Sequence, residues 1–143
     1  MSNRLARCEQ VSNETRVTIH HDGDVLAAAQ EGRQMAARAG FAGSDLAIIG
    51  TAISEVARNI LVHAKQGEIS FSVIKRTGGS GVLIVAEDQG PGIADIEQAM
   101  QDGFSTGKSL GFGLPGARRL MDEFEIVSQI GKGTTVTMRK WTR

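Results

Sequence analysis

A chain of 143 residues with 41% hydrophobic content fits one domain that buries a core of its own, which leaves no room for a second. Its 16 Lys and Arg residues balance 16 Asp and Glu residues, and no basic run occurs, which argues against a nucleic-acid-binding surface. The single cysteine, Cys8, and the lack of a secretory or membrane-length apolar run predict a cytoplasmic protein with no membrane partner.

The first half of the chain predicts a strand and two helices. We expect a flexible N-terminal leader at residues 1–13, a single domain at 14–143, and a first strand at 15–20, where apolar and polar residues alternate. Asp24 is expected to cap a helix that stops at Gly40. A longer helix begins near Ser44 or Asp45, and its apolar residues recur at helical spacing: Leu46, Ile49, Ile53, Val56, Ile60 and Leu61.

The second half predicts four strands and two further helices. Strands at 69–75 and 82–89 are joined at the Gly78-Gly79-Ser80-Gly81 turn. A short helix at 95–100, a glycine-rich loop and a helix with Pro115 at its first position follow. The chain closes with two strands: 125–130 and 134–140. These elements predict an α+β fold, a two-layer α/β sandwich with a mixed, largely antiparallel sheet and helices on one face.

Residues 88–93, Asp-Gln-Gly-Pro-Gly-Ile, stand where a well-buried strand ends. A buried carboxylate such as Asp88 needs a hydrogen-bond donor. Gly90 and Gly92 allow a ligand to approach the main chain, and Pro91 stiffens the turn between them. The stretch therefore predicts a nucleotide pocket; a tight strand-to-helix turn capped by Asp88 is the alternative.

Glu55, Asn59 and His63 recur at every fourth position of the long helix, so they line one edge of its apolar stripe. A carboxylate and an amide oxygen one turn apart suit a general base beside a Mg²⁺ ligand. The alternative is an ordinary polar flank in which Glu55 contacts Arg58 or Asn59. One His, one Glu and one Asn do not make up the ligand set of a zinc site.

The glycine-rich loop at 103–116 nearly matches two phosphate-binding motifs. Only three residues separate Gly103 from Gly107, whereas a Walker A loop requires four. The run 111–116 fits G-x-G-x-x-G, but no strand leads into it, so a Rossmann site is not expected. The pattern instead predicts a loop that leads into the N-terminus of a helix, whose free backbone amides attract phosphate. A disordered surface loop is the alternative.

In order and spacing, these segments resemble the N, G1 and G2 boxes of the GHKL ATPase and kinase superfamily. The N box is Glu55 with Asn59, the G1 box is the 88–93 turn, and the G2 box is the 111–116 run. Gly133-Thr134-Thr135 resembles the Gly-Thr element of the same pocket, and the resemblance spans roughly residues 15–140. The runs around these boxes are similar to bacterial serine/threonine switch kinases of the RsbT type.

The resemblance implies a GHKL (Bergerat) fold and an ATP- and Mg²⁺-dependent protein serine/threonine kinase. It implies that Glu55 is the catalytic base, that Asn59 is the Mg²⁺ ligand and that Asp88 accepts the adenine amino group. Lys108 is expected either to touch a phosphate or the incoming substrate, or to be only solvated. The ATP-binding residues that it implies are Asn59, Asp88, Gly90, Gly92, Ile93, Gly107, Lys108, Gly111, Phe112, Gly113, Leu114 and Thr134.

The resemblance also implies a partner-switching role in a stress-response module such as the stressosome. The substrate is expected to be a STAS-domain antagonist similar to RsbS or RsbR, and the released kinase is expected to activate a PP2C-type phosphatase or another downstream target. Two alternatives stay open: an anti-sigma factor kinase that binds a sigma factor directly, and a non-enzymatic ATP-dependent binding module, which needs no base at Glu55. Sensor histidine kinases and Hsp90-, MutL- or gyrase-like machines are not expected, because they carry further domains.

Overall fold

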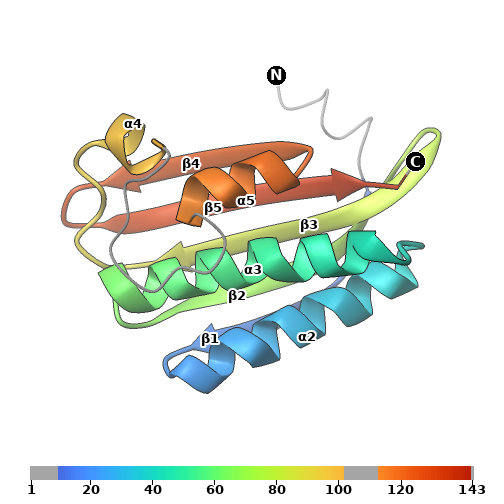
Figure 1. Ribbon diagram of the computed structural model, residues 1–143, viewed down its shortest axis with the longest axis horizontal. Coiled ribbons are helices and arrows are strands. Elements are labelled where there is room, and N and C mark those ends of the chain that lie inside the picture. The colour runs from blue at the N-terminus through green and yellow to red at the C-terminus, as the bar shows by residue number, and fades with distance from the viewer. Residues whose placement is uncertain (1–9, 102–112, 143) are drawn as a thin grey trace.

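Five strands and four helices form the described part of the chain, residues 10–101 and 113–142 of the computed structural model (Figure 1). The strands are β1 (Gln10–Ile19), β2 (Gly67–Arg76), β3 (Gly79–Asp88), β4 (Glu123–Gln129) and β5 (Gly133–Trp141). The helices are α2 (Asp22–Arg38), α3 (Ser44–His63), α4 (Ile96–Ala99) and α5 (Gly113–Leu120). Most of the expected leader, residues 1–9, and most of the glycine-rich loop lie outside this description.

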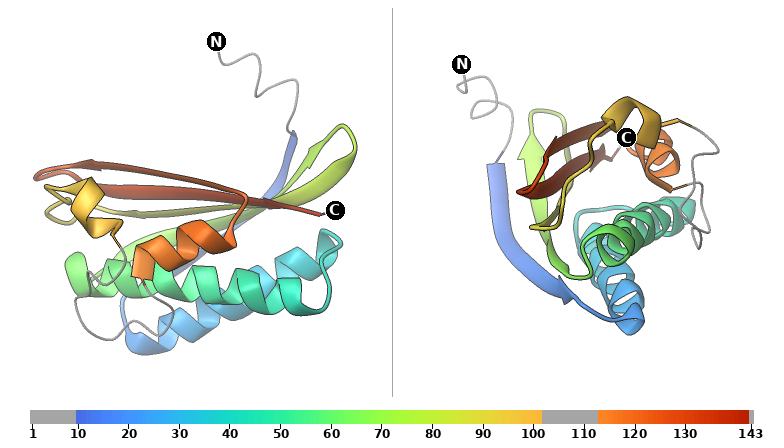
Figure 2. Two further views of the ribbon diagram at one scale, coloured as in Figure 1. Left: turned by 45° about the horizontal axis from the view of Figure 1, so that its top comes forward. Right: turned by 90° about the vertical axis from the view of Figure 1, so that its left-hand side faces the viewer.

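The strands form one sheet in the order β1-β2-β3-β5-β4, and every described pair of neighbours is antiparallel. The β2–β3 and β4–β5 connections are short hairpins, which join only antiparallel strands. Helices α2, α3 and α5 cover one face of this sheet (Figure 2). The predicted α+β sandwich is confirmed, and the described sheet is wholly rather than largely antiparallel.

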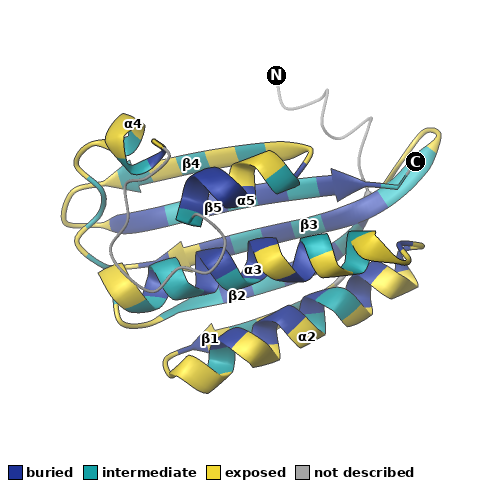
Figure 3. Cartoon of the chain, in the orientation of Figure 1, coloured by how far each residue is buried: buried dark blue, intermediate teal, exposed yellow. Residues whose placement is uncertain are grey.

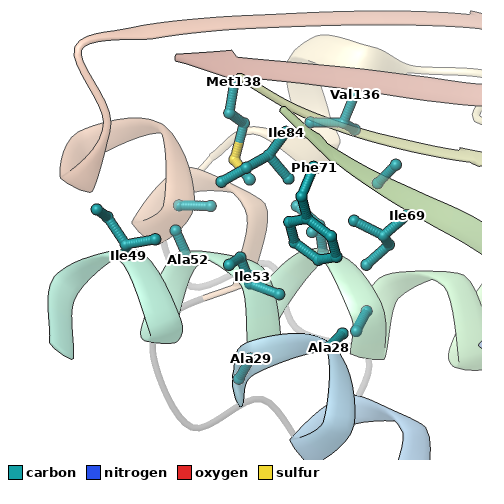
Figure 4. Packing of buried hydrophobic residues seen from close by; sticks show 14 of the residues in the cluster. Ala28, Ala29, Ile49, Ala52, Ile53, Ile69, Phe71, Ile84, Val136 and Met138 are labelled. Carbon is teal, nitrogen blue, oxygen red and sulfur yellow. The ribbon is translucent and has the colours of Figure 1, made fainter. Parts of the chain in front are cut away.

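The core lies between the sheet and α3. Phe71 of β2, Ile84 of β3 and Met138 of β5 are partners in register, so their side chains project from the same face. They pack toward Ile49 and Ile53 of α3, and all five side chains are buried (Figure 4). Buried and exposed residues also alternate around α2 and α3, as their helical spacing predicts (Figure 3).

Helix α3, which carries two of the predicted site residues, is held close to α2. A Cβ at Gly32 of α2 would overlap the Ile53 side chain, and one at Gly50 of α3 would lie 2.6 Å from Nη1 of Arg33. Contrary to the expectation of no membrane-length apolar run, α3 is long and apolar enough to cross a membrane by length and composition. Its apolar stripe instead faces the sheet, so α3 is the core helix of this domain.

The start of the chain differs from the sequence expectations in two ways. Strand β1 begins at Gln10 rather than at Thr15, so it extends into the segment expected to be a flexible leader. Asp24 is the third residue of α2 rather than its cap, because Oδ2 of its carboxylate accepts hydrogen bonds from the backbone amides of His20 (2.8 Å) and His21 (2.9 Å). These two bonds, the one from His21 foremost, lower the pKa of Asp24 below its usual 3.8.

Helix α3 begins at Ser44, as expected, with Gly43 at the capping position. Two local boundaries differ from the expectations. The β2–β3 turn consists of residues 77–78 alone, because Arg76 pairs with Gly79 and the following residues already belong to β3. Helix α5 begins at Gly113, so Pro115 lies in its first turn but is not its first residue.

Candidate functional site

A buried carboxylate and a buried hydroxyl meet at one end of the sheet. Asp88, the last residue of β3, is 6% exposed, and its register partner on β5, Thr134, is 5% exposed. Side chains directly opposite each other on antiparallel strands project from the same face. This face is the one that the helices cover, because Ala86 and Val136, the register pair two residues along the same strands, belong to the core.

The carboxylate of Asp88 has one oxygen engaged by its own turn. Oδ1 accepts a hydrogen bond from the backbone amide of Gly90 at 2.9 Å, a short-range bond typical of Asp in turns. Within the described part of the chain, no residue donates to the second oxygen, Oδ2. Asp88 therefore caps the turn, which is the alternative to a nucleotide pocket, and it also retains a second oxygen that a ligand can use.

The two glycines of the 88–93 turn are needed for packing. A Cβ at Gly90 would lie 2.5 Å from Cβ of Ala64, the residue that follows α3. Gly92 has a φ of +83°, and a Cβ there would overlap the backbone oxygen of Gln129 at the end of β4. The turn is therefore wedged between the end of α3 and the β4–β5 hairpin.

Ser128 of β4, which is not among the residues predicted from the sequence, connects the 88–93 turn to β5. Its Oγ accepts a hydrogen bond from the backbone amide of Ile93 at 2.7 Å. The same Oγ lies 2.8 Å from Oγ1 of Thr134 and 3.2 Å from the carbonyl oxygen of Gly133, to which it donates. A serine on an alternating strand carries no signal for this role, because strand serines are common and these partners depend on the sheet order.

The predicted N-box residues of α3 differ in exposure. Glu55 is 2% exposed, Asn59 and Arg58 are half-buried, and His63 is exposed. Glu55 and Asn59 are one helical turn apart, about 6 Å along the axis. The structure places Glu55 among the buried residues of α3, beside Val56 and Ala57, rather than on an ordinary polar flank.

The C-terminal end of α3 and the end of β3 lie together (Figure 1). Gly67, the first residue of β2, stands between them, because a Cβ there would lie 2.9 Å from Cγ2 of Ile60 and 3.1 Å from Cβ of Asp88. Ile60 is the residue after Asn59. The structure therefore brings the Asn59 end of the N box and the 88–93 turn to the same end of the molecule.

The predicted loop residues are only partly described. Gly113 and Leu114 begin α5, which packs against α3, and Leu114 is buried in the core. Gly107, Lys108, Gly111 and Phe112 lie outside the described residues. Among the described residues, no group of three or more His, Cys, Asp or Glu side chains forms a metal cluster.

One family model and several known proteins are similar to this chain. The model described as histidine kinase-like ATPase domain matches residues 5–140. The chain is 48% identical over 133 residues to the serine/threonine-protein kinase RsbT of Bacillus subtilis (strain 168), a match that covers 93% of this chain and 100% of RsbT.

Two relatives carry a different name. The chain is 39% identical over 101 residues to the anti-sigma F factor of Thermoanaerobacter sp. (strain X514), which covers 68% of this chain and 71% of that protein. It is 37% identical over 103 residues to the anti-sigma F factor of Geobacillus stearothermophilus, which covers 67% and 69%. The chain belongs to the histidine kinase-like ATPase domain family, and it is a GHKL-type, ATP-using protein serine/threonine kinase of the RsbT type.

Proposed function

We propose that this kinase transfers the γ-phosphoryl group of Mg²⁺-ATP to a serine or threonine of a STAS-domain antagonist in a bacterial partner-switching module. One observation supports this most directly: Glu55, 2% exposed, stands one turn from Asn59 on a helix whose end meets the Asp88 turn. A buried carboxylate one turn from Asn59 can act as the base in proton transfer, whereas nucleotide binding alone needs no base at Glu55.

Asp88 and Thr134 are the proposed adenine-binding residues. Oδ2 of Asp88 accepts a hydrogen bond from the exocyclic amino group, and Thr134, the register partner of Asp88, supplies Oγ1 from the neighbouring strand. Both residues are enclosed, so water competes little for these bonds. Gly90, Gly92 and Ile93 shape the wall of the pocket, which Ser128 and the end of α3 hold in place.

Asn59 is the proposed Mg²⁺ ligand. Its amide oxygen is a hard donor of the kind that Mg²⁺ prefers, and Mg²⁺ bound to a nucleotide needs only one or two protein ligands besides phosphates and water. The donor set of this end of α3 therefore fits the metal, although the described residues hold no larger cluster. When bound, Mg²⁺ neutralises charge on the phosphates.

Glu55 is the proposed catalytic base. It takes the proton from the serine or threonine hydroxyl as the oxygen of that hydroxyl bonds to the γ-phosphorus, the bond from the γ-phosphorus to the bridging oxygen breaks, and ADP leaves. A well-placed base accelerates such a step by roughly 10²–10⁴. Positioning supplies the remainder, because phosphoryl transfer depends on alignment and charge neutralisation. The loop residues Gly107, Lys108, Gly111 and Phe112, with Gly113 and Leu114, are proposed to bind the phosphates.

The partner cycle follows from charge. Phosphorylation adds about −1.5 to −2 charge to the contact between the STAS protein and the site that bears Glu55, and like charges repel. The product complex is weaker, and the released kinase is free to engage a PP2C-type phosphatase or another downstream target, as in a stressosome pathway. We place this cycle in the cytoplasm, where a single cysteine stays reduced.

A second function is favoured by the anti-sigma F factors, which are 39% and 37% identical to this chain. In this alternative the protein is also a kinase, but it binds a sigma factor directly. The two proposals differ in the partner that is held in the absence of Mg²⁺-ATP.

Transfer of labelled phosphate from Mg²⁺-ATP to purified STAS proteins tests the proposal. Glu55→Gln should lower transfer by roughly 10² or more and leave ATP affinity nearly unchanged, because the amide keeps the shape but cannot take a proton. Glu31→Gln on α2 is the matched control and should transfer phosphate at the normal rate. The STAS protein should co-purify with the kinase until Mg²⁺-ATP is added, and Glu55→Gln should keep the complex together. Tight binding of a sigma factor instead would establish the alternative.

A further inference from the structure

The hydroxyl of Ser128 makes three polar contacts, which is as many as it can satisfy. A hydroxyl has one proton to donate and two lone pairs that accept. Its partners are the backbone amide of Ile93 at 2.7 Å, Oγ1 of Thr134 at 2.8 Å and the carbonyl oxygen of Gly133 at 3.2 Å. The direction of each bond can therefore be assigned by elimination.

Two of the three partners have no choice of direction. The Ile93 amide only donates, and the Gly133 carbonyl only accepts. When all three contacts are hydrogen bonds, Ser128 donates its single hydroxyl proton to the Gly133 carbonyl. Thr134 must then donate its own hydroxyl proton to Ser128. The opposite direction would leave the Gly133 contact without a proton.

This direction changes what Thr134 offers to a ligand. With its proton turned toward Ser128, Oγ1 of Thr134 presents only lone pairs to the pocket. Its neighbour Asp88 accepts the hydrogen bond of the Gly90 amide through one carboxylate oxygen and offers the other as an acceptor. The enclosed end of β3 and β5 is therefore an acceptor-only surface, made by two side chains that are register partners.

We propose that Ser128 is a positioning residue for base selection: by holding the hydroxyl proton of Thr134, it makes the pocket prefer a purine with an amino group at position 6 over one with an oxo group. This inference rests on the proposed nucleotide site. An amino group donates hydrogen bonds to the oxygens of Asp88 and Thr134. An oxo group instead points its lone pairs at the lone pairs of these oxygens, which is repulsive. Enclosed sites reject such a ligand strongly, because buried polar groups are left unpaired.

Adenosine and inosine triphosphates are the probes, because they differ only at this edge of the base. Calorimetry gives the dissociation constant of each nucleotide, and the ratio of the two constants measures the selection. In Ser128→Ala, Thr134 is free to turn its proton toward the oxo group. The preference for the adenine nucleotide should therefore fall about tenfold, the worth of one hydrogen bond.

Two further variants separate this role from a structural one. Ser128→Thr keeps the hydroxyl and should retain the wild-type ratio. Ser80→Ala removes another half-buried hydroxyl, which donates to the carbonyl of Ala39 at 2.6 Å in the β2–β3 hairpin region, and should also leave the ratio unchanged. The inference would be overturned if Ser80→Ala lowered the ratio of the two dissociation constants. It would also be overturned if Ser128→Thr lowered this ratio as much as Ser128→Ala does.

The decisive negative result is a parallel change. If Ser128→Ala weakens both nucleotides equally, or neither, Ser128 only shapes the turn and the inference is wrong. Thermal unfolding shows whether Ser128→Ala is folded; if it is not, Thr134→Val removes the other hydroxyl of the same contact and must also lower the ratio. Wild-type protein that binds no adenosine triphosphate would refute the proposed function itself, whereas binding with an unchanged ratio refutes only the inference.

Discussion

Asp88 and Thr134 lie directly opposite each other on β3 and β5, and each is more than nine-tenths enclosed. Enclosure of an acidic side chain costs free energy unless a donor reaches it. The Gly90 amide satisfies one oxygen, and because Thr134 is the register partner of Asp88, this pair forms the centre of the proposed adenine pocket.

Asp88→Asn should weaken ATP binding. The substitution removes a charge-assisted hydrogen bond of about 1.5–3 kcal/mol, which corresponds to a rise of roughly 10- to 150-fold in the dissociation constant. Calorimetry measures it, with Asp45→Asn in the first turn of α3 as the control that should bind normally. Unchanged affinity in Asp88→Asn would remove this residue from the pocket.

Asn59→Ala should affect the part of ATP binding that depends on the metal. The affinity measured with Mg²⁺ should fall by roughly tenfold or more toward the value measured with a chelator, because a proposed oxygen ligand is gone. The affinity in the chelator itself should hardly change. Gln30→Ala, which removes an exposed amide of α2, is the control. An unaltered Mg²⁺ dependence in Asn59→Ala would contradict the assignment.

Gly92→Ala in the 88–93 turn and Gly131→Ala in the β4–β5 hairpin form a matched pair. Both glycines have a positive φ, +83° and +80°, but a Cβ at Gly131 has no atom within 4 Å, whereas one at Gly92 would overlap the Gln129 oxygen. Gly131→Ala should cost about 1 kcal/mol of stability from backbone strain alone. Gly92→Ala should cost about 3 kcal/mol, since overpacking adds to the strain. Urea denaturation measures both, and equal losses would disprove the wedge against Gln129.

Asp24 should contribute stability that depends on pH. Its pKa in the folded protein is lowered by the amides of His21 and His20, so the contribution is complete above the ordinary value of 3.8 and is lost as the pH falls through the lowered pKa. Asp24→Asn, which resembles the protonated carboxyl, should be less stable than wild type at pH 7, and the gap should close in acid. Denaturant midpoints from neutral to acid pH measure the gap, and the exposed Asp22→Asn is the control. A gap that stays constant with pH would contradict the stabilising role of the bonds from His20 and His21 to the Asp24 carboxylate.

Much of the fold follows from local patterns. Alternation along residues 82–89 predicts β3, and helical spacing predicts α3, because each element must turn its apolar side chains to one core. The place of Asp88 at the end of a buried strand is predictable for the same reason. Boundaries are less predictable: β1 starts at Gln10 because its polar first half is completed by pairing with β2, which no local pattern encodes.

Capping could not be assigned from the residue type alone. Asp suits both the cap and the third position of a helix, and the backbone amides of His20 and His21 decide between them. The conformational freedom of glycine predicts that Gly90 and Gly92 allow a ligand to approach the main chain. The packing of Gly90 on Ala64 and of Gly92 on Gln129 became visible only when the neighbours of the turn were known.

The sequence by itself determined which elements form and which polar residues stand at their ends, because side-chain alternation, helical spacing and glycine turns act between near neighbours along the chain. Only the tertiary structure decided that the end of α3, the turn after β3 and the β4–β5 hairpin meet, and that Ser128 joins them. Its hydrogen bond to Ile93 spans 35 positions and exists because β5 lies between β3 and β4 in the sheet. Such a contact depends on the order of the strands, which is set by the burial of the whole core.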